Sequence, residues 1–167
     1  FGGIADELAK DGIHLLPATT YLDDLLPSQG QVAGPKVSGK RLADVEYGMR
    51  IAKEVSRLDI GQTVVVKTGT VLAVEAFEGT NEAVKRGGGL GKGGATMVKV
   101  SKPEQDFRFD VPVVGPETVR TAADAGIDLI VVEAGCTLVL GSDEVEALCR
   151  EKKVAIWAED ASIVPES

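Results

Sequence analysis

The amino-acid sequence predicts an α/β or α+β domain in which helices flank one mixed β-sheet. Apolar residues that recur every three or four positions after Lys40 predict a long amphipathic helix. Two β-rich runs on either side of Thr68-Gly69 predict an antiparallel hairpin, and strands alternate with helices along the second half of the chain. Because such alternation favours parallel strands, the hairpin makes the expected sheet a mixed one.

The first 39 residues are expected to form a linker or hinge segment with short helices. The segment GGIADELAKDG predicts a helix that ends at Gly12, and a brief helical turn is expected at residues 21–26. Gly and Pro are frequent in PSQGQVAGPKVSGK, so we expect a loop there and one main domain over residues 40–162. Since the chain begins with Phe1 rather than Met, we also expect a fragment that lacks an amino-terminal part.

The first half of the main domain is predicted from local patterns. TVVVK and VLAVEA are expected to be the two strands of the hairpin. Thr80 is expected to cap a helix through NEAVKR, which Gly87 ends, and GGGLGKGG is expected to be a loop before the strand ATMVKV. One apolar stripe predicts the helix over residues 40–58: Leu42, Val45, Met49, Ala52 and Val55.

The second half continues the alternation. Pro116 suits the first turn of a helix that Gly126 ends, and IDLIVVEA is typical of a buried strand. CTLVL is expected to be a further short strand. Ser142 is expected to cap the helix in SDEVEALCREKK, and VAIWAE closes the series as a strand.

Composition excludes several classes of protein. Among 167 residues, 26 Asp and Glu face 18 Lys and Arg, giving a net charge of −8, so no nucleic-acid partner is expected. No apolar run is long enough to cross a bilayer, and the opening residues lack the layout of an export signal. With one histidine, His14, and two separated cysteines, neither a histidine-based triad nor a zinc site is expected.

The glycine cluster satisfies GxGxxG at Gly89, Gly91 and Gly94, but its context is wrong for a nucleotide fingerprint. It follows a helix and enters a strand, whereas a dinucleotide-binding loop follows a strand and opens a helix. We therefore expect a mobile loop. The alternative is a lid that orders over a ligand, with Lys92 as a phosphate contact.

Polar residues are dense in VEAFEGTNEAVKR, where a strand passes into a helix. Gly79, Thr80 and Asn81 at the helix start are candidates for binding an anion. Glu75 and Glu78 are candidate ligands for a divalent cation through their carboxylate oxygens. The alternative is an ordinary helix cap with carboxylates on the surface.

The segment KPEQDFRFDVPVVG is the strongest candidate for catalysis. If it is extended, Asp106, Arg108 and Asp110 project to one face while Phe107 and Phe109 point to the core. Two carboxylates around one guanidinium suit a metal ion and a phosphate, with the acids holding Mg²⁺ and the arginine a phosphoryl oxygen. The alternative is an ion-paired strand face exposed to solvent.

Three stretches closely resemble one known family: LDIGQTVVVKTGTVLAVEAFEGTNEAVKRGG, MVKVSKPEQDFRFDVPVVGPETV and EAGCTLVL. They are similar to the carboxy-terminal domain of LpxI-type UDP-2,3-diacylglucosamine pyrophosphatases. The resemblance implies hydrolysis of UDP-2,3-diacylglucosamine to lipid X and UMP in lipid A biosynthesis, with Mg²⁺ or another divalent cation. It also implies an amino-terminal nucleotide-binding-like domain that this chain lacks, so the fragment alone is expected to be inactive.

The resemblance directs attention to particular residues. Asp106 or Asp110 is expected to be the essential aspartate and both are candidate metal ligands, with Glu75 and Glu78 as second choices. Positive charge for the phosphates is expected from three further residues: Lys99, Lys102 and Arg108.

The family resemblance also implies a location and further partners. It implies a cytoplasmic protein, and because the sequence has no basic patch, only weak peripheral contact with the membrane is expected, at the inner face of the inner membrane. A homo-oligomer is a further partner to be considered.

One position departs from the family pattern. The family usually reads EGTD, whereas this chain has Asn81 after Thr80. A neutral amide oxygen at Asn81 would lower the charge of any metal site there. The second hypothesis is therefore a module without catalysis, which binds lipid or nucleotide sugar or supports oligomerisation while keeping the fold.

Overall fold

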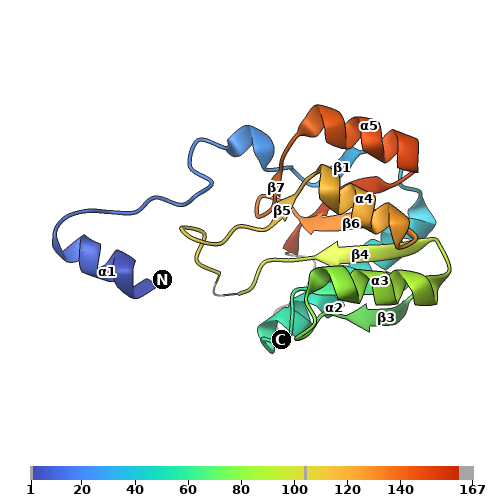
Figure 1. Ribbon diagram of the computed structural model, residues 1–167, viewed down its shortest axis with the longest axis horizontal. Helices are drawn as coiled ribbons and strands as arrows, with labels where there is room; N and C mark the ends of the chain where they lie inside the picture. Colours follow the sequence, from blue (N-terminus) through green and yellow to red (C-terminus); the bar gives the residue numbers. More distant parts are fainter. Residues whose placement is uncertain (1, 104, 162–167) are drawn as a thin grey trace.

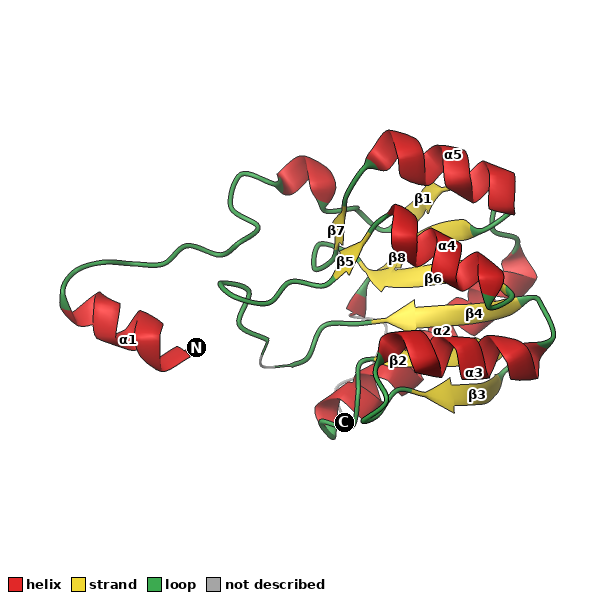
Figure 2. Ribbon diagram, viewed as in Figure 1, coloured by secondary structure: helices red, strands yellow, loops and turns green. Residues whose placement is uncertain are grey.

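The computed structural model describes residues 2–103 and 105–161. Over these residues it shows a six-stranded mixed sheet in the order β1-β8-β6-β4-β2-β3, with helices on both faces (Figures 1 and 2). The sheet strands are β1 (Gly30–Ala33), β2 (Thr63–Lys67), β3 (Thr70–Val74), β4 (Ala95–Lys99), β6 (Ile127–Glu133) and β8 (Ala155–Glu159). A separate short pair is formed by β5 (Val113–Val114) and β7 (Leu138–Val139). The helices are α1 (Gly2–Lys10), α2 (Gly39–Arg57), α3 (Thr80–Gly91), α4 (Pro116–Asp124) and α5 (Ser142–Lys152), with a 3₁₀ turn η1 (Asp23–Leu25).

The predicted mixed sheet is confirmed. Strands β4, β6 and β8 are parallel at its centre, and β2 pairs antiparallel with β4 and with β3. Thr68 and Gly69, both with positive φ (48° and 71°), form the tight turn between β2 and β3. Because a two-residue turn of this hand matches strand twist, the sequence signal for the hairpin was reliable.

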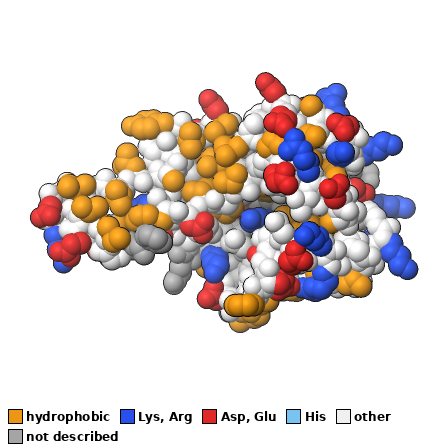
Figure 3. All heavy atoms as spheres, in the orientation of Figure 1, with side chains coloured by type: hydrophobic (Ala, Val, Ile, Leu, Met, Phe, Trp, Pro, Cys, Tyr) orange, Lys and Arg blue, Asp and Glu red, His pale blue; other side chains and the backbone are white. Residues whose placement is uncertain are grey.

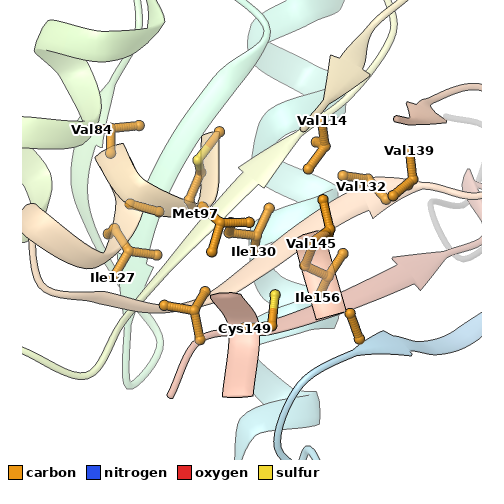
Figure 4. Packing of buried hydrophobic residues seen from close by; sticks show 14 of the residues in the cluster. Val84, Met97, Val114, Ile127, Ile130, Val132, Val139, Val145, Cys149 and Ile156 are labelled. Atoms are coloured by element: carbon orange, nitrogen blue, oxygen red, sulfur yellow. The ribbon is translucent and has the colours of Figure 1, made fainter. Parts of the chain in front are cut away.

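Two hydrophobic clusters hold the layers together. On one face of the sheet, α2 buries Val45, Met49 and Ala52 against β2, β4 and β6, which confirms the centre of the predicted stripe. On the other face, α3, α4 and α5 pack over a larger cluster that includes Met97, Ile130 and residues of β5 and β7 (Figure 4). The central strands are therefore buried on both faces, as their continuous apolar runs predicted.

The expected loop in PSQGQVAGPKVSGK is wrong over four residues. Gly30–Ala33 forms the edge strand β1, which pairs antiparallel with β8. Gly30, the first residue of the strand (φ 128°), and Gly34, the residue after it (φ 78°), allow the chain to turn sharply at both ends of the strand. The many Gly and Pro residues of this segment lie at and beyond the two ends of the strand. Because the strand between them is only four residues long, the sequence pattern did not indicate it.

The glycine-rich segment is a second correction, because most of it is helical. Helix α3 continues through Gly91 and ends at Lys92, which has left-handed backbone angles (φ 52°). A Cβ at Gly87 would lie 2.5 Å from Val65 Cβ, and one at Gly88 would lie 2.0 Å from the Ala125 carbonyl oxygen. These glycines let α3 lie close to β2 and to the end of α4, so they serve packing rather than loop flexibility.

The helix starts differ from prediction by one residue at two places. Gly79 and Gly141 occupy the N-cap positions of α3 and α5, with φ of 83° and 70°, and neither cap includes a side-chain hydrogen bond. Thr80 and Ser142, the expected caps, are the first helical residues. The predicted start at Pro116 and end before Gly126 are confirmed by α4.

Residues 2–19 form an arm that extends away from the sheet (Figure 1). Helix α1 and the segment after it expose Ile4, Ile13 and Leu16, and the arm contacts the rest of the chain where the Ala18 amide donates to the Phe107 carbonyl oxygen (2.8 Å). Hydrophobic side chains gather over this part of the surface, whereas charged ones cover the helical body (Figure 3). Among the described residues, no helix combines the length and apolar character that crossing a bilayer requires.

Candidate functional site

Polar side chains collect at one edge of the sheet, which we call the carboxyl edge. It is the edge at which β3, β4, β6 and β8 end and at which β1 and β2 begin. Ligands of open α/β sheets bind outside the carboxyl ends of the strands, because the turns there leave backbone groups and side chains unpaired by the sheet. The polar residues at this edge are Gln29, Gln62, Thr63, Glu75, Ser101, Glu133 and Glu159.

The loop that follows β4 carries the predicted catalytic residues and emerges at this edge. We call it the acid loop; its described residues are 101–103 and 105–112. The prediction that Asp106, Arg108 and Asp110 share one face of an extended strand is wrong, because residues 107–109 form a turn. The Asp106 carboxylate accepts from the Arg108 amide (3.1 Å), and the Asp106 carbonyl oxygen accepts from the amides of Phe109 (2.9 Å) and Asp110 (3.0 Å). An aspartate that bonds the backbone two residues ahead favours a turn over a strand.

Asp106 and Arg108 form a two-pronged ion pair inside this turn. The Arg108 Nε donates to Asp106 Oδ1 (2.8 Å) and its Nη2 to Oδ2 (2.7 Å). The pair is about one third exposed, and these hydrogen bonds lower the pKa of Asp106 and raise that of Arg108. Asp106 is therefore held as a carboxylate, and the guanidinium is fixed in one orientation.

The two phenylalanines do not both anchor the loop in the core, as the sequence predicted. Phe107 is half-buried, and Phe109 exposes 39% of its surface. The Phe109 ring instead lies 5.6 Å from the Arg108 guanidinium carbon, a cation–π contact. In the turn, neighbouring side chains no longer alternate between two faces, so the strand argument fails for both rings.

Lys102 and Asp110 lie on the exposed side of the acid loop. The Lys102 ammonium donates to Asp59 (2.7 Å), and this bond raises the pKa of Lys102, with smaller contributions from Asp110 and Glu75. Asp110 and Glu75 are thus near enough to Lys102 for their charges to act on it. A hollow beside Lys102 is lined by Ser56, Arg57, Asp59, Lys102 and Pro103.

Glu75 and Thr80 form a second polar group at the carboxyl edge. The Thr80 hydroxyl donates to Glu75 Oε1 (2.7 Å), and the backbone amide of Gln62 donates to Glu75 Oε2 (3.4 Å). Glu75 is 9% exposed, so its carboxylate is held by these neighbours rather than by bulk water. The first turn of α3 also contains the exposed Asn81, two residues after Gly79 at the cap.

Glu78 has a different set of hydrogen-bond partners from Glu75. Its carboxylate accepts from Arg86 (2.5 Å) and from the Ala76 amide (3.1 Å), and the hydrogen bond from Arg86 lowers its pKa. Within residues 2–103 and 105–161, no three Asp, Glu, His or Cys side chains gather closely enough to hold a metal ion. The four carboxylates predicted as ligands, Glu75, Glu78, Asp106 and Asp110, therefore form no ready-made metal site.

The two remaining lysines lie at opposite edges of the sheet. Lys99 is the last residue of β4 and pairs in register with Thr63, so it belongs to the carboxyl edge. Lys92 follows α3 and precedes β4, which places it at the other edge. The structure therefore separates Lys92 from the acid loop by the length of β4.

Sequence reasoning assigned no role to the buried carboxylates that end two central strands. Glu133 and Glu159 are the last residues of β6 and β8 and lie side by side in register. Glu133 accepts from Lys53 (2.9 Å) and from Ser101, and Glu159 accepts from Trp157 (2.8 Å) and Gln29 (2.5 Å). An acidic residue closing an otherwise apolar buried strand is the signal that could have found them, because a buried carboxylate requires partners.

Comparison with known proteins identifies one family. The model of the LpxI C-terminal domain matches residues 28–157. A curated relative, the UDP-2,3-diacylglucosamine pyrophosphatase LpxI of Caulobacter vibrioides, is 36% identical over 152 residues, which cover 86% of this chain and 54% of that protein. The chain thus spans about half the length of this relative.

Proposed function

The chain belongs to the LpxI family, and from this premise we propose that it is the C-terminal domain of an enzyme that hydrolyses UDP-2,3-diacylglucosamine to lipid X and UMP. The observation that carries the proposal is the match over residues 28–157, which includes the acid loop and all of the sheet except the last two residues of β8. The position of the acid loop beside the carboxyl ends of parallel strands supports a ligand site there.

In this proposal the acid loop binds the diphosphate through its cations. Arg108 is fixed by Asp106 and presents its remaining N–H groups to a phosphoryl oxygen. Lys102 and Lys99 add positive charge at the same edge of the sheet. These contacts would balance the charge that develops on the phosphoryl oxygens as the phosphoanhydride is broken.

Asp110 is assigned the role of proton acceptor. Both oxygens of Asp106 are taken by Arg108, whereas Asp110 is exposed at the end of the turn. A water molecule forms a bond to the α-phosphorus, the bond from that phosphorus to the bridging oxygen breaks, and Asp110 takes the water proton. UMP keeps the α-phosphate, and lipid X leaves with the bridging oxygen.

A divalent cation belongs to the proposal through the family resemblance. Since no three acidic side chains gather among the described residues, a preformed metal site is not part of it. Mg²⁺ in proteins is commonly held by one or two carboxylates together with phosphate oxygens of the substrate. Asp110 or Glu75 would suit that arrangement, and removal of the cation by a chelator is expected to stop UMP release.

The arm supports the lipid part of the proposal. Its exposed Ile13 and Leu16 adjoin the acid loop through the bond from Ala18 to Phe107. This apolar surface suits acyl chains and weak contact with a membrane, in keeping with a place at the inner face of the inner membrane. An amino-terminal domain, as in the family, would complete the cleft.

The second candidate is a module that binds the same ligands without hydrolysis. It is favoured by Asn81, which stands in the first turn of α3 where the family usually has an aspartate. Binding of lipid X or UDP-sugar without UMP release by the full-length protein would support this candidate.

The test joins this chain to the amino-terminal domain that the family resemblance implies and measures UMP release. Asp106→Ala and Asp110→Ala are each expected to lose about 100-fold or more in kcat. Asp124→Asn is the matched control, because Asp124 is an exposed aspartate at the end of α4, just before β6 begins at the edge of the sheet opposite the acid loop. Near-normal turnover in both acid-loop variants would remove the catalytic assignment, and the 167-residue chain alone is expected to release no UMP.

A further inference from the structure

A buried carboxylate with no assigned role lies beneath the acid loop. Glu133 ends β6 with 5% of its surface exposed. Its Oε2 accepts from both the backbone amide (2.8 Å) and the hydroxyl (2.6 Å) of Ser101, and its Oε1 accepts from the Lys53 ammonium (2.9 Å). One carboxylate thus joins α2, β6 and the residue at which the acid loop begins.

Ser101 is held more firmly than any other described point at the start of the loop. It is 4% exposed, both of its donors bond to Glu133, and its carbonyl oxygen accepts from the buried Ser56 hydroxyl (3.3 Å). The next attachment, from Lys102 to Asp59, joins two exposed side chains and is therefore weak. The far end of the loop is fixed at Pro112, whose carbonyl oxygen accepts from the Leu138 amide (2.9 Å).

Between these two ends, the bonds named for the loop are local, apart from the one that the Ala18 amide of the arm donates to the Phe107 carbonyl oxygen. Gln105 accepts from the Lys102 amide and donates to the Asp110 carbonyl oxygen, and Asp106 pairs with Arg108. Such bonds fix the shape of the turn. The orientation of the turn relative to the sheet is therefore set mainly by the ends at which the loop is attached. The direction of Arg108 and Asp110 therefore depends on how Ser101 is held.

A carboxylate suits this position better than an amide. Glu133 accepts three hydrogen bonds, one of them from a cation, and Lys53 supplies the charge that a buried carboxylate requires. A glutamine has one oxygen and one NH₂ group, so it would turn a donor toward either Lys53 or Ser101. Glu133→Gln therefore breaks the arrangement with almost no change in side-chain volume.

The neighbouring strand provides a matched control. Glu159 ends β8, lies in register with Glu133 and is equally buried at 5% exposure. It accepts from Trp157 and Gln29, and neither of these bonds reaches the acid loop. Glu159→Gln therefore perturbs a buried carboxylate of the same kind at the same edge of the sheet.

We propose that Glu133 is a positioning residue, which acts through Ser101 to orient the acid loop toward the diphosphate. Lys53 is the counter-ion of Glu133. The catalytic part of this inference rests on the proposed function. The structural part, that Glu133 fixes the direction of the loop, stands independently of what the loop binds.

Hydrogen exchange of this chain tests the structural part without any substrate. In Glu133→Gln, amides of residues 105–111 are expected to exchange about tenfold faster, while amides of β4 and β6 keep their protection. Glu159→Gln is expected to leave residues 105–111 unchanged. If Glu133→Gln unfolds the chain, Ser101→Ala removes one of the two bonds and is expected to give a smaller increase in the same amides. Unchanged exchange in the folded variant would overturn the inference.

Kinetics of the enzyme with its amino-terminal domain tests the catalytic part. Glu133→Gln is expected to lower kcat about 100-fold with little change in KM, because the loop keeps its binding groups but no longer holds them in the productive orientation. Glu133→Asp, which keeps the charge, is expected to recover part of the loss, and Glu159→Gln to retain normal kcat. Normal kcat in Glu133→Gln would overturn the positioning role. If the unaltered enzyme releases no UMP, the proposed function fails, and the exchange result still decides whether Glu133 fixes the loop.

Discussion

Two glycines of α3, only two positions apart, are expected to respond oppositely to alanine. Gly89 is exposed, and a Cβ there would have no atom within 4 Å. Gly87 is buried, and a Cβ there would meet Val65 atoms at 2.5, 2.7 and 2.8 Å. Both changes bring the same gain in helix propensity, so their difference isolates the contact between α3 and β2.

The expected magnitudes follow from these distances. Glycine in a helix interior is about 1 kcal/mol less favourable than alanine, so Gly89→Ala is expected to stabilise by nearly that much. Overpacking costs about 3 kcal/mol when a rigid neighbour such as the Val65 branch must move, so Gly87→Ala is expected to destabilise by about 2 kcal/mol net. For a chain of this size, 1 kcal/mol shifts Tm by about 2–4 °C.

Urea denaturation and thermal melting of the two variants provide the measurement. Equal effects of the same sign would refute the packing argument. In the full enzyme, Gly89→Ala is expected to keep normal UMP release. A large loss of activity without a loss of stability would instead support the alternative that GGGLGKGG orders over a ligand.

Three further outcomes are expected. Because the bond to Arg108 lowers the pKa of Asp106, the midpoint of its titration by NMR should fall below 3.8. The stability that Asp106 contributes should be fully present above its pKa in the unfolded chain and should be lost as the pH falls through its lower pKa in the folded chain. A midpoint at or above 3.8 would contradict the ion pair. Burial raises the pKa of Cys149 to about 11, so at pH 8 about one thiol in a thousand is ionised. In a Cys136→Ser variant, Cys149 should therefore react with a thiol reagent only after the chain is unfolded in urea. Lys92→Ala should leave kcat and KM unchanged, because Lys92 lies at the edge of the sheet opposite the acid loop; a rise in KM would place the diphosphate elsewhere.

The parts of the fold with strong local signals could be predicted from the sequence. Thr68-Gly69 allows positive φ at both turn positions, and the stripe along α2 has one helical period. The missed strand β1 has four residues and depends on pairing with β8, which follows it by more than one hundred residues. The glycines of α3 were misjudged because close packing against Val65 and Ala125 leaves no trace in the local sequence.

The candidate site was predictable in composition and less so in geometry. The acids and the arginine of the acid loop could be named from the sequence. The direction in which their side chains point could not be predicted, because Asp106 accepts hydrogen bonds from the backbone amides that follow it and so turns the chain. Glu133 could not be linked to Ser101 because the two residues are 32 positions apart and meet only when β4 and β6 pair. Contacts between strands that are distant in sequence therefore set the part of the site that local patterns leave open.

A structure of the full-length protein with bound lipid X tests the central claim most directly. The proposal predicts that the lipid X phosphate lies at the carboxyl edge, within hydrogen-bond distance of Arg108 or Lys102 and next to Asp110. A phosphate bound at the opposite edge, near Lys92 and the end of α3, would contradict the assignment of the acid loop.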